Sequence, residues 1–127
     1  STSDPKTLIY SVKKRTDPKS HFVVEATLTG QSHILAVFGT QWSTLTLGEA
    51  TESGKEIEFA ADADDPLPTD VGQFTGKVLA VRCKEAMDGR VEGDFRVYEV
   101  QHGHVVARKR SKDPLAEGET RELELPW

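Results

Sequence analysis

The chain has 127 residues, of which 36% are hydrophobic and 29% are charged, and both values suit one folded domain over residues 1–127. Its 16 basic and 21 acidic residues give a formal net charge of −5, which argues against a chain built throughout to coat nucleic acid or anionic lipid. No apolar run approaches the length of a transmembrane helix, so we expect no membrane partner.

An alternation of apolar and polar residues, the pattern of half-buried strands, recurs along the whole chain. It is clearest over residues 22–29, where Phe22, Val24 and Ala26 would share one face. Residues 34–38 are apolar throughout, which predicts a strand covered on both faces. In chain order the strand candidates are 8–13, 22–29, 34–38, 42–47, 57–59, 78–83, 95–100, 105–108 and 123–125.

The segments between these candidates have the composition of tight turns. Thr29-Gly30, Asp88-Gly89 and His102-Gly103 each place a glycine where a hairpin needs a positive φ. Helical patterns are weak, and only residues 84–87 and 114–117 could form a turn or two. We therefore predict an all-β fold, a single-domain antiparallel β-barrel or β-sandwich of about eight to nine short strands with little helix. Alternation does not give strand order, so barrel and sandwich both stay open.

Two acidic segments interrupt the strand pattern. Residues 60–76 predict a long surface loop that is rich in aspartate and proline. Its aspartates are Asp62, Asp64, Asp65 and Asp70. Their spacing differs from that of an EF-hand, so a solvated loop is a better interpretation than a calcium site. Residues 113–127 form a second acidic segment, which ends in Pro126-Trp127.

Motifs for catalysis or metal binding are weak. His102 and His104 would point to one side of an extended segment, but they fall in a predicted turn with no carboxylate shortly after them. Cys83 alternates with Val81 and should face the core, and a lone cysteine cannot form an internal disulfide. Phosphate-binding glycine motifs and a nucleophile elbow are absent. We therefore expect no enzyme activity, no cofactor and no metal, in a cytoplasmic, reducing setting.

Segregated charge is the most suggestive feature of the sequence. Half of the 16 basic residues fall into two clusters, each at the end of a predicted strand. The clusters are Lys13, Lys14, Arg15 and Lys19, and Arg108, Lys109, Arg110 and Lys112. If the two strand ends meet in space, they form a basic patch that binds phosphate groups. The alternative is that they are solvated strand ends, whose charges keep edge strands from pairing with other chains.

The two tryptophans are the aromatic candidates for a binding site. Trp42 could line a pocket for a small hydrophobic ligand, as in a calycin-like barrel, or it could pack in the core. Trp127 follows a proline in a position where a core seldom needs so large a residue. We expect it either to fold back onto its own sheets or to insert into a partner or a second subunit.

These features together favour a non-enzymatic binding module that engages a protein partner or self-associates as a homo-oligomer. Segregated charges steer such partners into register. Two alternatives stay open. One is a small OB-like barrel that binds nucleic acid through the two basic clusters, and the other is a calycin-like pocket for a small hydrophobic ligand.

Overall fold

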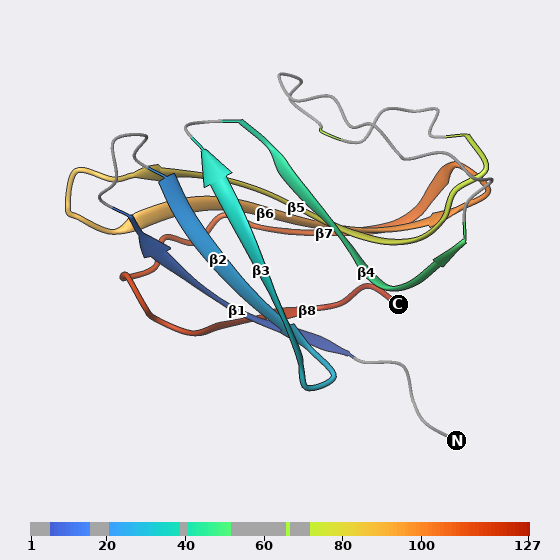
Figure 1. The fold of residues 1–127 in the computed structure, drawn as a ribbon, viewed down its shortest axis with the longest axis horizontal. Coiled ribbons are helices and arrows are strands. Elements are labelled where there is room, and N and C mark those ends of the chain that lie inside the picture. Colours follow the sequence, from blue (N-terminus) through green and yellow to red (C-terminus); the bar gives the residue numbers. More distant parts are fainter. Residues whose placement is uncertain (1–5, 16–20, 39–40, 52–65, 67–71) are drawn as a thin grey trace.

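The computed structural model describes residues 6–15, 21–38, 41–51, 66 and 72–127. These residues form two antiparallel sheets of four strands each (Figure 1). Sheet A has the order β3-β2-β1-β8, and sheet B has the order β4-β5-β6-β7. The strands are β1 (Thr7–Lys14), β2 (His21–Leu28), β3 (Gln31–Phe38), β4 (Ser43–Thr51), β5 (Thr75–Glu85), β6 (Val91–Gln101), β7 (His104–Ser111) and β8 (Arg121–Glu124).

The main core lies between the two sheets. Alternate residues of β1, namely Leu8, Tyr10 and Val12, pack in one cluster with residues of β5 and β6 such as Val81 and Phe95. The rings of Tyr10 and Phe95 stack across this core with their centroids 4.1 Å apart. Burying this apolar surface is the main force that holds the two sheets together.

The sheets are linked at both edges, although no strand ladder joins them among the described residues. At one edge, the Ser43 hydroxyl donates a hydrogen bond to the Ala36 carbonyl over 3.0 Å. At the other edge, Leu115 forms an isolated bridge with Val91 of sheet B. The Gly118 N–H then donates to the Val12 carbonyl of sheet A over 2.9 Å. The described strands therefore form two layers and no closed barrel.

The predicted hairpin turns are confirmed. Thr29 and Gly30 join β2 to β3 with φ values of 53° and 78°, and His102 and Gly103 join β6 to β7 with φ values of 50° and 82°. Positive φ at both central residues defines the two-residue turn that matches the twist of a hairpin. Gly89, in the connection between β5 and β6, also has a positive φ of 83°.

Eight of the nine strand candidates coincide with observed strands, and residues 57–59 lie outside the described part. No helix forms at 84–87 or 114–117: the first segment continues β5 to Glu85, and the second contains the bridge at Leu115 and the start of a tight turn at Ala116. β6 begins four residues earlier than predicted, since Gly93 and Asp94 resemble turn residues. The described residues contain no helix, and so none that could cross a membrane.

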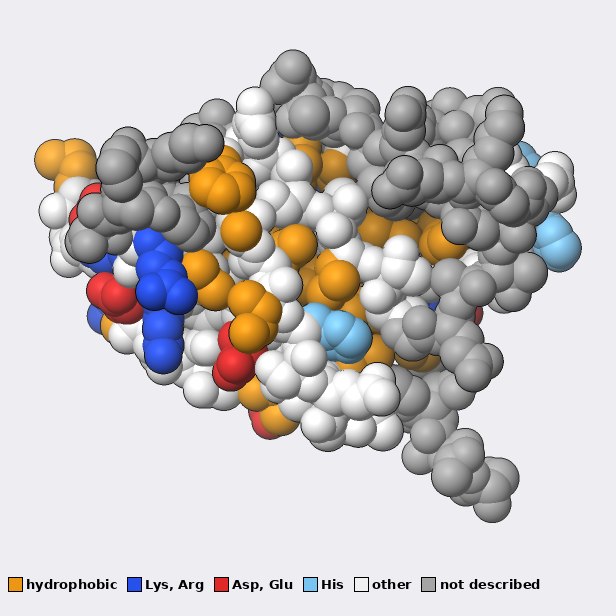
Figure 2. Space-filling model, in the orientation of Figure 1, with side chains coloured by type: hydrophobic (Ala, Val, Ile, Leu, Met, Phe, Trp, Pro, Cys, Tyr) orange, Lys and Arg blue, Asp and Glu red, His pale blue; other side chains and the backbone are white. Residues whose placement is uncertain are grey.

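The two sheets differ in how their outer faces are covered. The prediction that residues 34–38 are covered on both sides is wrong, because Ile34 is 70% exposed and Phe38 is 43% exposed on the outer face of sheet A. Figure 2 shows hydrophobic side chains over the middle of that face. Sheet B instead carries a second buried cluster on its outer face. That outer cluster consists of Trp42, Phe74, Val78, Ala80, Tyr98 and Val100.

Candidate functional site

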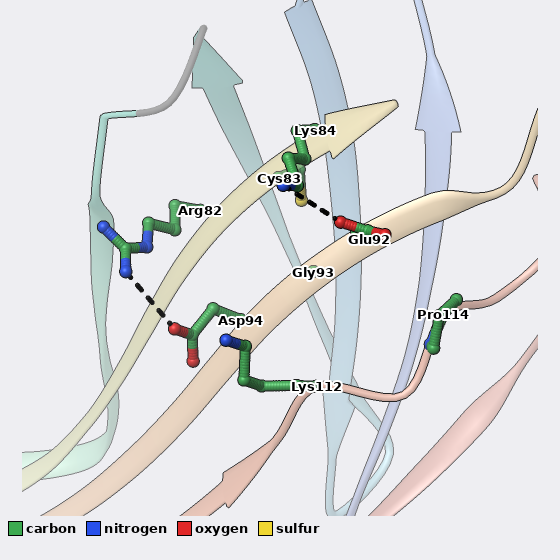
Figure 3. A pocket seen from close by; sticks show the side chains of 8 residues that line it. All are labelled: Arg82, Cys83, Lys84, Glu92, Gly93, Asp94, Lys112 and Pro114. Atoms are coloured by element: carbon green, nitrogen blue, oxygen red, sulfur yellow. Dashed lines mark ion pairs between the residues drawn. The ribbon is translucent and has the colours of Figure 1, made fainter. Parts of the chain in front are cut away.

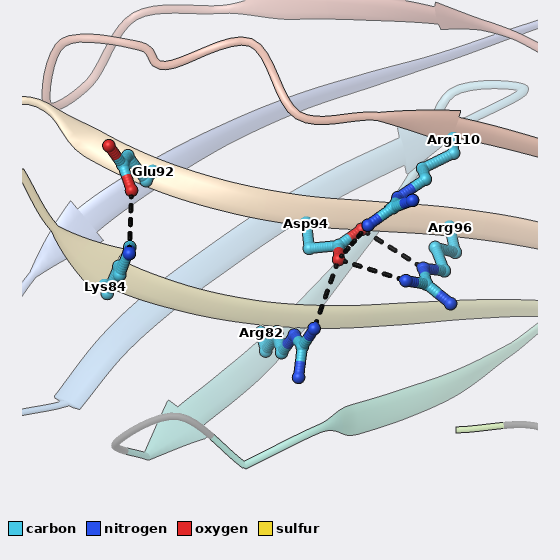
Figure 4. A network of polar contacts seen from close by, with 6 residues as sticks. All are labelled: Arg82, Lys84, Glu92, Asp94, Arg96 and Arg110. Carbon is cyan, nitrogen blue, oxygen red and sulfur yellow. Dashed lines mark hydrogen bonds and ion pairs between the residues drawn. The ribbon is translucent and has the colours of Figure 1, made fainter. Parts of the chain in front are cut away.

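Asp94, near the start of β6, is the one charged residue that is buried among the described residues, and only 5% of its surface is exposed. Arg96 donates two hydrogen bonds to its carboxylate, over 3.2 and 3.3 Å, and Arg110 donates two more, over 3.1 and 3.0 Å (Figure 4). Nη2 of Arg82 lies 3.6 Å from Oδ2 of the same carboxylate. Guanidinium groups from three neighbouring strands therefore converge on one carboxylate.

The register of the strands brings these side chains together. Arg82 of β5 pairs with Asp94 of β6, and Arg96 pairs with Arg110 of β7. Asp94 and Arg96 are two residues apart and point to the same face, opposite to Phe95 in the core. The cluster therefore lies on the outer face of sheet B, where Asp94 relieves the repulsion between two directly paired arginines.

Trp42 covers two of these arginines. The Cζ atoms of Arg82 and Arg96 lie 4.5 and 4.9 Å from the centroid of the Trp42 ring. Contacts of this kind are attractive and hold the planar guanidinium groups against the ring. Trp42 is only 7% exposed, so its ring supports the arginines and offers little surface to a hydrophobic ligand.

Two opposing effects act on the pKa of Asp94. Burial takes the carboxylate out of water and by itself raises the pKa, whereas hydrogen bonds and positive charge from Arg110 and Arg96 lower it. The arginines prevail, so the pKa of Asp94 lies below its ordinary value. The carboxylate is therefore ionised at neutral pH, and it fixes the guanidinium groups in place.

A pocket of about 470 Å³ opens beside Asp94, between β5, β6 and the segment that follows β7 (Figure 3). Arg82, Lys84 and Lys112 line it with positive charge. Glu92 also lines it, and its carboxylate lies 3.2 Å from the Lys84 amine. We call this pocket together with the cluster around Asp94 the cationic site.

The described residues of the two basic clusters lie near the same end of the structure, one cluster at the end of β1 in sheet A and the other at the end of β7 in sheet B (Figure 1). Arg108 and Arg110 pair with Tyr98 and Arg96 and so share the outer face of sheet B. Lys109 alternates to the other side of β7, opposite the core residue Val97.

The first cluster belongs to sheet A. Lys13 is exposed and points away from the core residue Val12, while the Lys14 amine pairs with Glu85 of β5 over 2.9 Å. Arg15 is exposed at the end of β1, and Lys19 lies outside the described residues. The described residues of the two clusters therefore lie on different sheets, and the second cluster contributes Arg110 and Lys112 to the cationic site.

The two tryptophans lie in different parts of the structure. Trp127 is half-buried and packs against the main core, with the Lys77 amine 5.1 Å from its ring centroid. Its Nε1 is buried and has no hydrogen-bond partner among the described residues. Of the two roles expected for this residue, folding back onto its own sheets is the one observed.

The remaining candidates among the described residues do not gather into a site. His102 occupies the β6–β7 turn, where its N–H donates to the Thr75 hydroxyl over 3.0 Å, and His104 is exposed at the start of β7. No group of three His, Cys, Asp or Glu side chains within the described part could hold a metal ion. Cys83 faces the core as predicted, and burial raises its pKa to about 12. Most of the acidic loop at 60–76 lies outside the described residues, and β5 already begins at Thr75.

Sequence reasoning missed the centre of the cationic site. Asp94, Arg82 and Arg96 were not singled out, although each falls on the positions of its strand that alternate with core residues. The sequence does contain a signal for this site: charged residues of opposite sign alternate with core residues in two successive strands. No protein-family model, curated protein or solved structure matches the chain, so the geometry of the site carries the functional conclusion.

Proposed function

We propose that the chain is a non-enzymatic β-sandwich domain that binds an acidic segment of a protein partner through the cationic site. Two sheets that pack face to face without a joining ladder support a sandwich rather than a barrel. The observation that carries the functional proposal is the excess of positive charge among the described residues on the outer face of sheet B, where Asp94 and Trp42 hold the arginines in place. Lone buried Cys83 is consistent with the cytoplasmic setting expected from the sequence.

Fixed cations favour binding because less side-chain freedom is lost when a ligand arrives. Asp94 and the Trp42 ring already hold Arg82 and Arg96 in place. Arg110 is anchored at its guanidinium group, yet its side chain is still 48% exposed. An acidic segment would therefore meet oriented donors rather than flexible, fully hydrated side chains.

A protein partner fits the site better than single-stranded nucleic acid does. Binding of single strands combines cations with aromatic rings on which bases stack. The aromatic residues of the outer cluster are buried, with Trp42 at 7%, Phe74 at 2% and Tyr98 at 1% exposure. The exposed ring of Phe38 lies on sheet A, on the opposite outer face. Within the described part of the chain, the cationic site thus offers charge without a stacking surface.

A second copy of the chain is the alternative partner. Glu117, Glu122 and Glu124 are exposed at or near β8, the edge strand of sheet A. Docking this acidic edge onto the cationic site of another copy joins two different surfaces, which is a head-to-tail contact that forms rings or open chains. Native mass spectrometry at low salt distinguishes the two partners, because self-association gives multiples of the 14.0 kDa chain.

The proposal is tested by titrating the protein against a labelled oligoglutamate peptide and following fluorescence anisotropy. We expect binding that weakens as salt rises, since salt screens exposed charges. Lys112→Glu should weaken binding about tenfold or more, because one attraction becomes a repulsion. Lys13→Glu is the matched control, with the same change of charge on the outer face of sheet A.

Three results would count against the proposal. The first is no binding at low salt, and the second is equal weakening by the two variants, which would indicate only general electrostatics. The third is tighter, salt-sensitive binding of a single-stranded oligonucleotide, which would favour the nucleic-acid alternative.

A further inference from the structure

Among the described residues, more cations than carboxylates line the pocket of the cationic site. Three cations and two carboxylates of the described residues line it, and two further arginines bind one of those carboxylates from beside the pocket. The cations are Arg82, Lys84, Arg96, Arg110 and Lys112, and the carboxylates are Glu92 and Asp94. Asp113 is not among the residues that line the pocket, and its charge acts on Tyr10.

The carboxylates are already occupied by neighbours. Asp94 accepts four hydrogen bonds from Arg96 and Arg110, and Glu92 lies 3.2 Å from the Lys84 amine. The cations without a close carboxylate are Lys112, which forms no ion pair with a described residue, and Arg82, whose nearest described carboxylate atom is 3.6 Å away.

These donors approach the pocket from two directions. Arg82 comes from β5 and Lys112 from the segment after β7, with β6 between them (Figure 3). The Asp94 side chain lies between them, so a group that enters the pocket beside this carboxylate could accept hydrogen bonds from both sides. An ion with oxygens on several sides uses such an arrangement better than a flat carboxylate does.

From this arrangement we propose that the pocket binds a phosphate group on a phosphorylated side chain of the protein partner. The inference rests on the proposed function and names the group that this site recognises. A phosphorylated side chain carries close to two negative charges at neutral pH and three acceptor oxygens, whereas a glutamate carries one charge. The dianion therefore matches the two cations without a close carboxylate, Lys112 and Arg82, more closely than a single carboxylate does, and guanidinium groups pair well with phosphate oxygens.

The test compares three labelled peptides of one acidic sequence, with phosphoserine, serine or glutamate at the central position. We expect the phosphoserine peptide to bind at least tenfold more tightly than the serine peptide, because charge-assisted hydrogen bonds contribute that much. The glutamate peptide should fall between them. Inorganic phosphate should displace the phosphoserine peptide, but only at concentrations well above those of the peptide itself.

Two variants locate the effect. Lys112→Gln should remove most of the preference for phosphoserine, whereas Lys109→Gln, with the same loss of charge on the other side of β7, should leave the preference intact. Lys84→Gln is a second variant on the opposite wall of the pocket, and it should reduce the preference in the same direction. Urea unfolding of each variant verifies that it is folded.

The outcomes separate this inference from the function on which it rests. Equal, salt-sensitive binding of all three peptides would overturn the phosphate site and leave the acidic-segment proposal standing. A failure of every peptide to bind would overturn both. Inorganic phosphate that binds as tightly as the phosphoserine peptide would show that the partner contributes nothing, and stronger displacement by an oligonucleotide would assign the site to a nucleic-acid backbone. Both results would overturn the inference.

Discussion

The account of the cationic site predicts that Asp94→Asn destabilises the protein strongly, although the side chain keeps its shape. Removing one partner of a buried ion pair costs about 3–5 kcal/mol, because the other charge stays buried without compensation. Here Arg96 is the buried partner, with 14% of its side chain exposed, whereas Arg110 at 48% and Arg82 at 33% can turn towards water. We therefore expect the lower end of that range, about 3 kcal/mol at pH 7.

Urea unfolding followed by circular dichroism gives this difference, provided that the slopes of the two transitions agree. Glu92→Gln is the matched control, since it removes the same charge two residues away on the same face. The pair of Glu92 with Lys84 is solvent-exposed, with side-chain exposures of 42% and 68%, so its loss should cost less than about 1 kcal/mol.

The same pair of proteins has a defined pH dependence. The pKa of Asp94 is lowered in the folded state, so its contribution is complete above the ordinary aspartate pKa of about 3.9 and is lost as pH falls through the lowered value. The difference between the wild type and Asp94→Asn should therefore shrink in acid. A difference within about 0.5 kcal/mol at pH 7, the size of an ordinary surface substitution, would refute the reasoning. So would a difference that persists unchanged at low pH.

Three further predictions concern other parts of the structure. Gly103→Ala should lower the free energy of unfolding by more than Gly30→Ala does. Both glycines have a positive φ, which costs alanine about 1–2 kcal/mol. A Cβ at Gly103 would in addition collide with the Gly72 carbonyl, whereas a Cβ at Gly30 would meet open space. Equal losses in urea unfolding would contradict this close approach. Cys83 should react with a thiol reagent at pH 8 far more slowly in the folded protein than in urea, because burial raises its pKa to about 12; equal rates would contradict its burial. Trp127→Ala should lower the free energy of unfolding by about 2 kcal/mol, because it removes a half-buried ring. Trp127→Phe should lower it clearly less, because phenylalanine keeps a ring and lacks the Nε1 that has no partner among the described residues. Equal losses would mean that the ring contributes nothing.

Local features of the fold could be predicted because they depend on neighbouring residues. The turns at Thr29-Gly30 and His102-Gly103 follow from glycine at a position of positive φ, and the alternation in β1 and β2 follows from one buried face. The error at Ile34 has the same origin, since an apolar sequence does not tell whether a second layer covers the strand.

The site itself depends on information that a local pattern lacks. Arg82 meets Asp94 only because β5 and β6 pair in one particular register, and Arg110 meets them only because β7 lies on the other side of β6. The basic clusters of the sequence therefore predicted two of the five cations of the cationic site, Arg110 and Lys112. They also grouped these two with residues of sheet A, which lie on a different sheet. Once the register is known, the alternation rule assigns every one of these side chains to its face.

The central claim is that an acidic partner binds the outer face of sheet B. It is tested most directly by nuclear magnetic resonance, with the acidic peptide titrated into isotopically labelled protein at low salt. The account predicts shifts in the amide signals of β5, β6 and the end of β7, including those of Arg82, Asp94 and Lys112, with small changes in β2 and β3. Shifts centred on Lys13 and the outer face of sheet A, or no shifts at all, would contradict it.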